Sequence, residues 1–180
     1  TTPMRARRDA LSGAVAIVAA LERLMHDESD TVRFTVGRFE VHPGSPNTVP
    51  GRVHFTIDLR HPDETVLAER GGRIAGVAAA YAKGCAIRVQ EISNVAPTVF
   101  APEIVALVRD CAARLGLAHM DLPSGAGHDA MHIARLCPTG MIFVPCLRGI
   151  SHNEAESATP ADLAAGARVL AEALVALADR

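Results

Sequence analysis

The segment Ser124-Gly125-Ala126-Gly127-His128-Asp129 carries the residue types of a catalytic or anion-binding loop. Glycines ahead of a helix allow backbone N–H groups to approach an anion, and His128 would then lie at the mouth of the loop. A tight turn capped by Asp129, with an incidental histidine, also fits the spacing. A third interpretation pairs His128 with His132 four residues later, as in a zinc-protease helix, with Asp where the general base is normally Glu.

A second polar segment, residues 149–156, follows directly after an apolar run that we expect to be a buried strand. In open α/β sheets, ligands bind in the crevice beyond the carboxyl ends of the strands. His152 lies there between Ser151 and two carboxylates, so it is a candidate metal ligand or general base. A solvated loop without a function is the alternative.

The third candidate is the pair Asn47 and Arg60. Asn47 precedes an expected strand and Arg60 ends it on the exposed face. A guanidinium fork together with an amide suits a small carboxylate. A surface arginine paired with Asp58 or Asp63 is the alternative.

The elements that must position these residues follow from periodicity. Apolar residues at three- and four-residue spacing predict a first helix over residues 3–26. Alternation of apolar and polar residues predicts a strand through Val32, Phe34 and Val36 and a second strand over 52–60. Turn-forming residues predict a loop at 42–47 between them. A helix over 63–83 with a C-terminal cap at Gly84 comes next, and then a third strand through Ile87, Val89 and Ile92.

This order, α-β-β-α-β, is a ferredoxin-like unit without its first strand, which suggests that polypeptide is missing before Thr1. Residues 94–102, with two prolines, indicate a boundary. The fold class is therefore α/β, with a first domain over residues 1–97 and a second over 98–180.

The second segment predicts a helix over 102–115 stopped by Gly116, a strand over 141–144 that is covered on both faces, and a last helix opened by Thr159-Pro160-Ala161-Asp162. These elements look like one edge of an α/β sandwich. The residues expected to hold the last helix on a core are Leu163, Ala167, Leu170, Leu174 and Leu177.

Composition narrows the function classes. The 180 residues are 49% hydrophobic, 21% charged and only 3% aromatic, with a formal net charge of −2. This is globular composition, and it argues against binding to nucleic acid or anionic lipid. No apolar run approaches the length of a membrane span. Four scattered cysteines favour reduced thiols in a cytoplasmic protein.

Several motifs together resemble the hydantoinase/carbamoylase family of amidases, which includes N-carbamoyl-L-amino-acid hydrolases, allantoate amidohydrolases and β-ureidopropionases, and which belongs with the di-metal aminoacylases and carboxypeptidases. They span the chain in the family's order: Thr1-Thr2-Pro3-Met4, Pro46-Asn47-Thr48-Val49-Pro50-Gly51, Asp58-Leu59-Arg60, Pro123-Ser124-Gly125-Ala126-Gly127-His128-Asp129-Ala130, Met141-Ile142-Phe143-Val144-Pro145 and Gly149-Ile150-Ser151-His152-Asn153-Glu154-Ala155-Glu156.

The resemblance implies a role for each candidate. His152 matches a ligand of one of two divalent ions, zinc or manganese, and His128 a residue that contacts the substrate and helps to polarise its scissile carbonyl. Gly127 belongs to the same substrate-binding loop, and Asn47 and Arg60 match residues that grip the substrate carboxylate. Residues 1–97 resemble a lid that also forms a homodimer, and residues 98–180 resemble the end of the catalytic domain. The implied reaction is cleavage of a C–N bond of a small ureido acid by a metal-activated water.

The family's remaining metal ligands and its general base precede the lid, so no residue here matches them. We therefore expect the C-terminal part of such an enzyme, inactive without the N-terminal catalytic part. The alternatives are an aminoacylase or peptidase of the same superfamily, and a non-catalytic dimerisation fragment.

Overall fold

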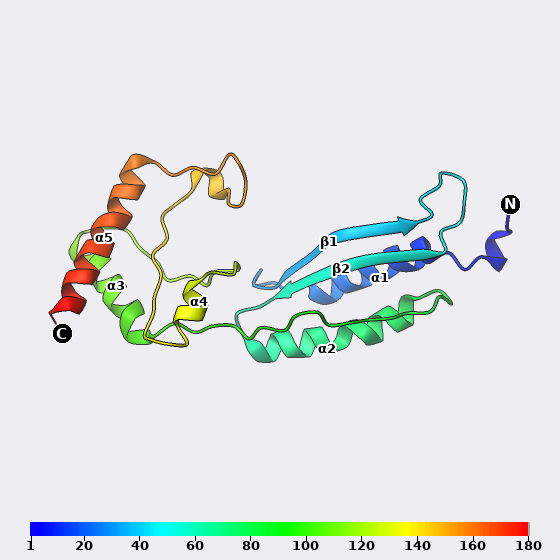
Figure 1. Cartoon of the computed structure of the whole chain (residues 1–180), viewed down its shortest axis with the longest axis horizontal. Coiled ribbons are helices and arrows are strands. Elements are labelled where there is room, and N and C mark those ends of the chain that lie inside the picture. The colour runs from blue at the N-terminus through cyan, green and yellow to red at the C-terminus, as the bar shows by residue number, and fades with distance from the viewer. Residues whose placement is uncertain (180) are drawn as a thin grey trace. The chain divides into compact units, whose positions relative to one another are not determined.

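The structure is a computed structural model that describes residues 1–179 (Figure 1). The chain divides between Pro97 and Thr98 into two compact units. Together they make an α/β protein with a two-stranded sheet and helices. Within the described part of the chain, no helix has both the length and the apolar character that crossing a bilayer requires.

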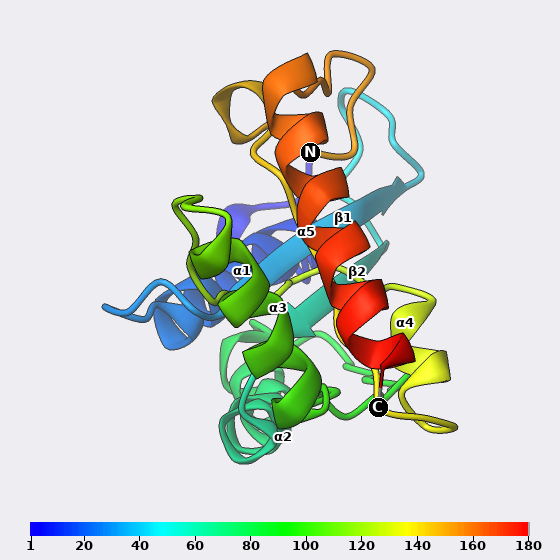
Figure 2. The same cartoon turned by 90° about the vertical axis from the view of Figure 1, so that its left-hand side faces the viewer.

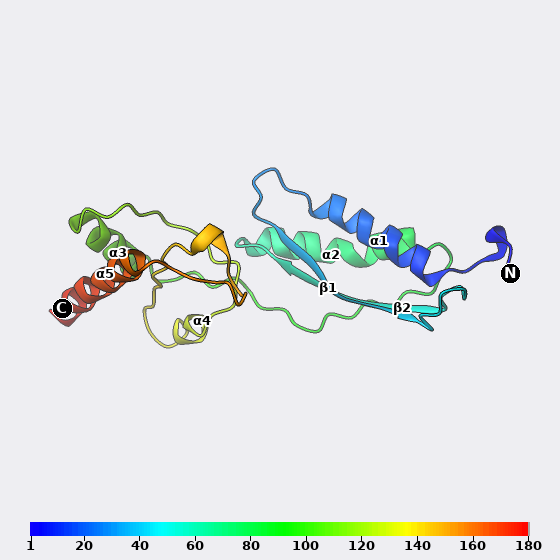
Figure 3. The same cartoon turned by 90° about the horizontal axis from the view of Figure 1, so that it is seen from above.

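The N-terminal unit is an antiparallel hairpin with two helices on one of its faces (Figure 3). Its elements are a 3₁₀ turn at Met4–Ala6, α1 (Ala10–Met25), β1 (Arg33–His42), β2 (Arg52–Arg60) and α2 (Glu64–Tyr81). The predicted strand over 52–60 is confirmed. Its alternation also holds, since Phe55, Ile57 and Leu59 pack against the core residues of the helices while Arg52, His54, Asp58 and Arg60 are exposed. The core of the unit consists of Ile17, Leu21, Met25 and Ala78, with Phe34, Phe55, Ile57 and Leu59 packed against it.

β1 is longer than its alternation predicts because it contains a β-bulge. Thr35 pairs with Asp58 and Arg38 with Thr56, so three steps along β1 match two along β2. The extra residue moves the apolar positions of β1 from even to odd numbers. Phe39 then stacks on Phe55 with ring centroids 5.5 Å apart. The hairpin therefore continues to His42, which was expected to be loop.

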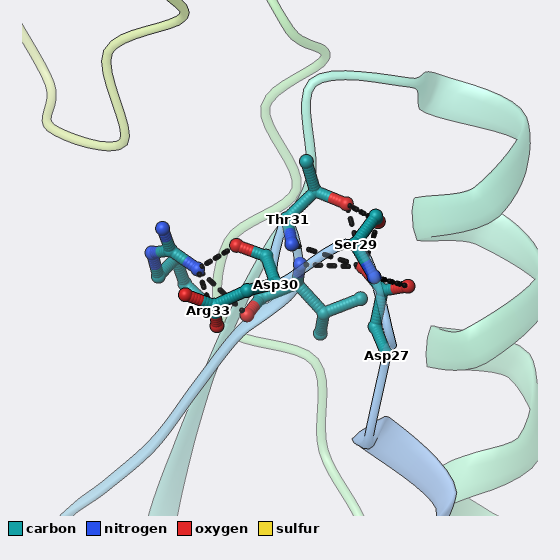
Figure 4. A network of polar contacts seen from close by, with 6 residues as sticks. Asp27, Ser29, Asp30, Thr31 and Arg33 are labelled. Carbon is teal, nitrogen blue, oxygen red and sulfur yellow. Dashed lines mark hydrogen bonds and ion pairs between the residues drawn. The ribbon is translucent and has the colours of Figure 1, made fainter.

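The turn between α1 and β1 is organised by the Asp27 carboxylate (Figure 4). It accepts hydrogen bonds from the hydroxyl and backbone N–H of Ser29, at 2.7 and 3.1 Å, and from those of Thr31, at 2.6 and 2.9 Å. These donors, the Ser29 hydroxyl first, hold the pKa of Asp27 far below its ordinary value. The connection from helix to strand is thus fixed by one side chain.

Aspartates also set where the two helices begin. The side chain of Asp9 accepts from the backbone N–H of Ser12, so α1 begins at Ala10, and the prediction that it begins at residue 3 is wrong. Asp63 caps α2 in the same way, and Gly84 follows that helix at φ 78°, as predicted.

The expected third strand is wrong. Residues 87–92 form no strand, and the chain returns along the unit as an irregular segment (Figure 1). Ile87, Val89 and Ile92 are 42%, 50% and 81% exposed. Apolar alternation makes a strand only where a partner strand supplies hydrogen bonds, and neither β1 nor β2 pairs with this segment. The described part of the unit therefore has the order α-β-β-α.

The C-terminal unit is built on α3 (Pro102–Arg114) and α5 (Pro160–Ala178), which lie side by side (Figure 2). The remaining elements are α4 (Ala130–Ile133) and a 3₁₀ turn at Leu147–Gly149. The predicted start of α5 is confirmed, since the Thr159 hydroxyl accepts from the backbone N–H of Asp162 at 3.1 Å. The core consists of Leu107, Cys111, Ala112, Val169 and Ala173, with Ile142 packed against it.

Two predictions for this unit are wrong. Residues 141–144 form no strand, because no other strand lies beside them in the described part of the unit. α5 faces its core with Val169, Ala173 and Ala176 instead of its leucines. The leucines remain about half exposed, at 39–57%: Leu163, Leu170, Leu174 and Leu177. The small side chains allow α5 a close approach, and a Cβ at Gly166 would lie 2.5 Å from a methyl carbon of Val144.

Candidate active site

The glycine-rich loop holds His128 through a side chain that the sequence did not single out. The Ser124 hydroxyl oxygen lies 2.7 Å from Nε2 of His128 and accepts the backbone N–H of Ala126 at 3.2 Å. The ring of Phe143 meets the imidazole edge-on, with centroids 5.5 Å apart at 61°. His128 is half-buried, and no described residue provides a partner for its Nδ1. One ring nitrogen is therefore fixed and the other is presented outward.

Gly127 lies beside this imidazole and is exposed. A Cβ built on it would meet no atom within 4 Å, so packing does not require a glycine here. The open space leaves the backbone at residue 127 accessible to a small molecule. The substrate-binding role that the resemblance implies for Gly127 stays a prediction.

The other two interpretations of this segment do not fit. Asp129 precedes α4, but its side chain makes no capping hydrogen bond, so the predicted cap is wrong. The zinc-protease interpretation needs His128 and His132 on one helical face, whereas the helix begins only at Ala130 and has four residues.

His152 lies in a loop closed by a backbone hydrogen bond from Leu147 to Ser157 of 2.7 Å. Its backbone has a φ of 56°, in the left-handed region that side chains other than glycine rarely adopt. The Glu156 carboxylate accepts the backbone N–H of His152 at 2.8 Å, and the Ser151 hydroxyl lies 2.6 Å from Nδ1. The side chain is exposed, and no described residue contacts Nε2 as a hydrogen-bond partner. Such an imidazole can bind a metal ion through Nε2.

The chain does not complete a metal site by itself. Among residues 1–179, no group of three or more His, Cys, Asp or Glu side chains could hold an ion. His152 thus fits one position of a coordination sphere, with its second nitrogen beside the Ser151 hydroxyl. The other donors would have to come from other residues.

Arg60 lies at the end of β2 and forms a bidentate pair with Asp58. Nε and one terminal nitrogen of Arg60 lie 2.7 and 2.9 Å from the two oxygens of Asp58. Arg60's hydrogen bonds lower the pKa of the Asp58 carboxyl, and the same contact raises the pKa of Arg60. The alternative that pairs this arginine with Asp58 is confirmed, and both side chains remain about half exposed.

Asn47 lies in the turn between the strands, where its side-chain oxygen accepts from Ser45 at 3.1 Å. It lines an open depression of about 600 Å³ together with Thr2, Arg7, Asp9 and Pro50. Its side-chain nitrogen points to no described acceptor.

Asn47 and Arg60 do not come together within one chain. Asn47 precedes the start of β2 and Arg60 is its last residue, so the nine-residue strand separates them. At about 3.3 Å per residue, the first and last residues of β2 are roughly 26 Å apart. Side chains at these two positions cannot hold one small carboxylate from the same subunit.

Sequence reasoning missed the supporting residues Ser124, Phe143, Ser151 and Glu156. A usable signal was present for two of them, because Ser124 precedes one histidine by four residues and Glu156 follows the other by four. A four-residue spacing suits a contact across a single tight loop. Phe143 could not be found in this way, since it reaches His128 from a segment 15 residues away.

Comparisons with known proteins identify the family of the chain. The profile of peptidase family M20/M25/M40 matches residues 4–176. An N-carbamoyl-L-amino-acid amidohydrolase of Paenarthrobacter aurescens is 42% identical over 180 residues, which cover 98% of this chain and 43% of that protein. The allantoate amidohydrolase of Escherichia coli (strain K12) is 36% identical over 187 residues, covering 99% of this chain and 44% of that protein.

A solved structure has the same fold over nearly the whole chain. It is an amidase of the hydantoinase/carbamoylase family from Burkholderia multivorans, with a TM-score of 0.91 and 46% identity, covering 97% of this chain and 43% of that one. The chain spans less than half the length of these relatives. The resemblance to the hydantoinase/carbamoylase amidases is confirmed, and the chain belongs to peptidase family M20/M25/M40.

Proposed function

We propose that this chain is the C-terminal part of a metal-dependent amidohydrolase that cleaves a C–N bond of an N-carbamoyl-L-amino acid or a related ureido acid. The observation that carries the proposal is how the ring nitrogens of His128 and His152 are partnered. His128 and His152 each have one ring nitrogen within 2.7 Å of a serine hydroxyl and the other without a described partner. The named activities of the relatives, N-carbamoyl-L-amino-acid and allantoate amidohydrolase, supply the substrate class.

In this proposal His152 donates Nε2 to one of two divalent ions, zinc or manganese. Bound ions of this kind supply the acidity that makes a water nucleophilic at neutral pH. Ser151 on Nδ1 and Glu156 on the backbone N–H orient the ring. His128 donates a hydrogen bond to the carbonyl oxygen of the ureido group, where negative charge develops during attack, and Gly127 leaves room for the substrate beside it.

We further propose that residues 1–97 form a lid of ferredoxin-like type that pairs with a second copy. The argument is the separation of Asn47 and Arg60 along β2. If both bind the substrate carboxylate, then they belong to different subunits, and each active site is completed by the lid of the partner. Arg60 would exchange its present carboxylate partner, Asp58, for the substrate or share it between them.

The exposed leucines of α5 support the existence of a covering segment. Leu163, Leu170, Leu174 and Leu177 repeat at helical spacing, and no described residue buries them. We propose that the remaining part of the catalytic domain, which also carries the other metal ligands, packs on this stripe.

The four cysteines are free thiols, which supports a cytoplasmic location.

The proposal is tested in the complete enzyme with N-carbamoyl-L-amino acids as substrates. His152→Ala should remove bound metal and hydrolysis together, whereas His132→Ala, an exposed histidine on α4, should change neither. Unchanged metal content in the His152 variant would reject the ligand assignment. Loss of metal in the His132 variant would instead favour the zinc-protease interpretation.

An aminoacylase or peptidase is the second candidate, because the family profile that matches the chain is described as a peptidase family. The two activities differ in the bond that is cut. Release of ammonia from a carbamoyl substrate supports the amidohydrolase, and cleavage of acyl or peptidyl substrates alone supports the second candidate.

A further inference from the structure

We propose that Ser124 is a positioning residue that fixes which nitrogen of His128 carries the proton. The inference rests on the proposed function, since it concerns how His128 can donate to a substrate carbonyl. It starts from the contact between the Ser124 hydroxyl oxygen and Nε2 at 2.7 Å. A neutral imidazole has one N–H donor and one acceptor nitrogen, so a partner on one nitrogen decides the role of the other.

One of the two acceptor positions on the Ser124 hydroxyl oxygen is already in use. Its oxygen accepts the backbone N–H of Ala126 at 3.2 Å, and its own hydrogen remains to be donated. Among the described residues, the acceptor within reach of that hydrogen is Nε2 of His128. Donation by the hydroxyl makes Nε2 the acceptor and leaves the ring proton on Nδ1.

Phe143 contributes to the same arrangement. Its ring meets the imidazole edge-on, which limits rotation of the histidine about its side-chain bonds. Ser124 and Phe143 therefore fix both the plane of the ring and the identity of its outward nitrogen. The outward nitrogen is Nδ1, for which no described residue is a partner.

This arrangement matches what the reaction requires. A group that polarises a carbonyl must present an N–H, and it must keep doing so at a pH where the histidine is neutral. With the proton held on Nδ1, His128 is a donor in both its neutral and its charged form. Without Ser124, the neutral ring is free to carry its proton on Nε2, and the outward nitrogen then becomes an acceptor.

The decisive measurement is the tautomer of His128 in the full 180-residue chain, read from long-range ¹H–¹⁵N correlation spectra at about pH 8, where an ordinary histidine is neutral. The eight histidines are separated by assigning His128 from the spectrum of His128→Gln. We expect Nδ1 to be protonated and Nε2 to be unprotonated in the wild-type chain. Ser124→Ala should shift the proton toward Nε2, and Ser124→Thr, which keeps the hydroxyl, should restore the wild-type pattern.

A wild-type spectrum with the proton on Nε2 overturns the proposal, and so does an unchanged tautomer in a folded Ser124→Ala chain. Because the wild-type spectrum decides by itself, a variant that fails to fold does not leave the question open. The measurement needs neither metal nor substrate. The expected tautomer in a protein that hydrolyses no ureido acid would therefore reject the proposed function and retain the role of Ser124.

In the complete enzyme at about pH 8, Ser124→Ala should lower kcat. The loss should approach the roughly 100-fold that follows removal of one oxyanion donor. Ser124→Thr, which keeps the hydroxyl, should restore kcat. An equal loss of kcat in Ser124→Thr and Ser124→Ala would indicate a structural role and would contradict the proposal.

Discussion

The Glu156 carboxylate accepts the backbone N–H of His152 at 2.8 Å and holds that histidine at a φ of 56°. A left-handed backbone at a residue other than glycine costs of the order of 1 kcal/mol or more, so it persists only where the surroundings support it. The strained backbone lies at His152, the residue that we propose as a metal ligand. The direction of the imidazole thus depends on a carboxylate that need not touch the metal.

Glu156→Ala should therefore weaken metal binding by the complete enzyme. The His152 loop loses its acceptor, and we expect a fall in metal affinity of about 10- to 100-fold, the usual result of removing an outer-shell partner. Titration with zinc against a competing chelator measures it. Glu154→Ala is the matched control, because Glu154 is in the same exposed loop and makes no hydrogen bond to a described residue. Equal losses in the two variants would contradict the role of Glu156.

Arg60→Ala should raise KM for substrates that carry a carboxylate and leave kcat much less affected. Hydrogen bonds to a charged group contribute about 1.5–3 kcal/mol, which corresponds to roughly 10- to 150-fold in KM. Steady-state kinetics with a substrate and its amide analogue measure the effect. Arg38 provides the control, since it pairs with Glu40 two residues away on the same strand just as Arg60 pairs with Asp58. An effect of Arg60→Ala that is equally large for the amide would argue against carboxylate binding.

Asp27→Asn should destabilise the N-terminal unit at neutral pH. The depressed pKa of Asp27 means that the folded state favours the charged form, which accepts from Ser29 and Thr31. This contribution is fully present above the unfolded-state pKa of about 3.9 and is lost as pH falls through the lower folded-state pKa. Thermal unfolding should show a lower midpoint for the variant at pH 7 and a smaller difference in strong acid. Asp30→Asn is the comparison, because the side chain of Asp30 is 94% exposed and, among the described residues, pairs only with Arg33, at 3.4 Å. A difference for Asp27→Asn that does not depend on pH would reject this explanation.

Gly166→Ala should destabilise the C-terminal unit through a clash with Val144. The new Cβ would lie 2.5 Å from a Val144 methyl carbon, and overpacking of this kind costs about 1–3 kcal/mol. Val144→Ala in the same chain should recover part of the loss, since it removes the methyl group. Gly72→Ala, in α2 with open space around its Cβ, should instead be neutral or stabilising by up to about 1 kcal/mol. Urea unfolding of these three variants and the wild type measures the differences. A Gly166→Ala variant as stable as the wild type would show that α5 can shift.

Local interactions made much of the fold predictable from the sequence. The start of α5 follows from a threonine and an aspartate three residues apart, and the end of α2 from Gly84. The second strand follows from the alternation of Val53, Phe55, Ile57 and Leu59 against polar neighbours. In each case the residues that determine the element lie within a few positions of one another, so the sequence pattern is sufficient to predict it.

Tertiary structure decided the conformation of segments that need a neighbouring strand or helix. Residues 87–92 and 141–144 have the apolar pattern of strands but form none, because no neighbouring strand supplies their hydrogen bonds. The leucine stripe of α5 looks like a core face, yet α3 packs on the side with the smaller residues Val169 and Ala173. The bulge in β1 is visible in the sequence only as a change from even to odd apolar positions at Gly37.

For the candidate site too, the sequence predicted some features and the structure determined the others. Residue types and spacing singled out His128, His152, Asn47 and Arg60, since imidazole, amide and guanidinium groups stand out against an apolar chain. The structure determined the hydrogen-bond partner of each ring, Ser124 for His128 and Ser151 for His152. It also separated Asn47 from Arg60 by the length of β2, because an extended strand carries its two ends apart. Sequence alone identified which groups can do the chemistry, and only folding in three dimensions decided which of them are close enough to act together.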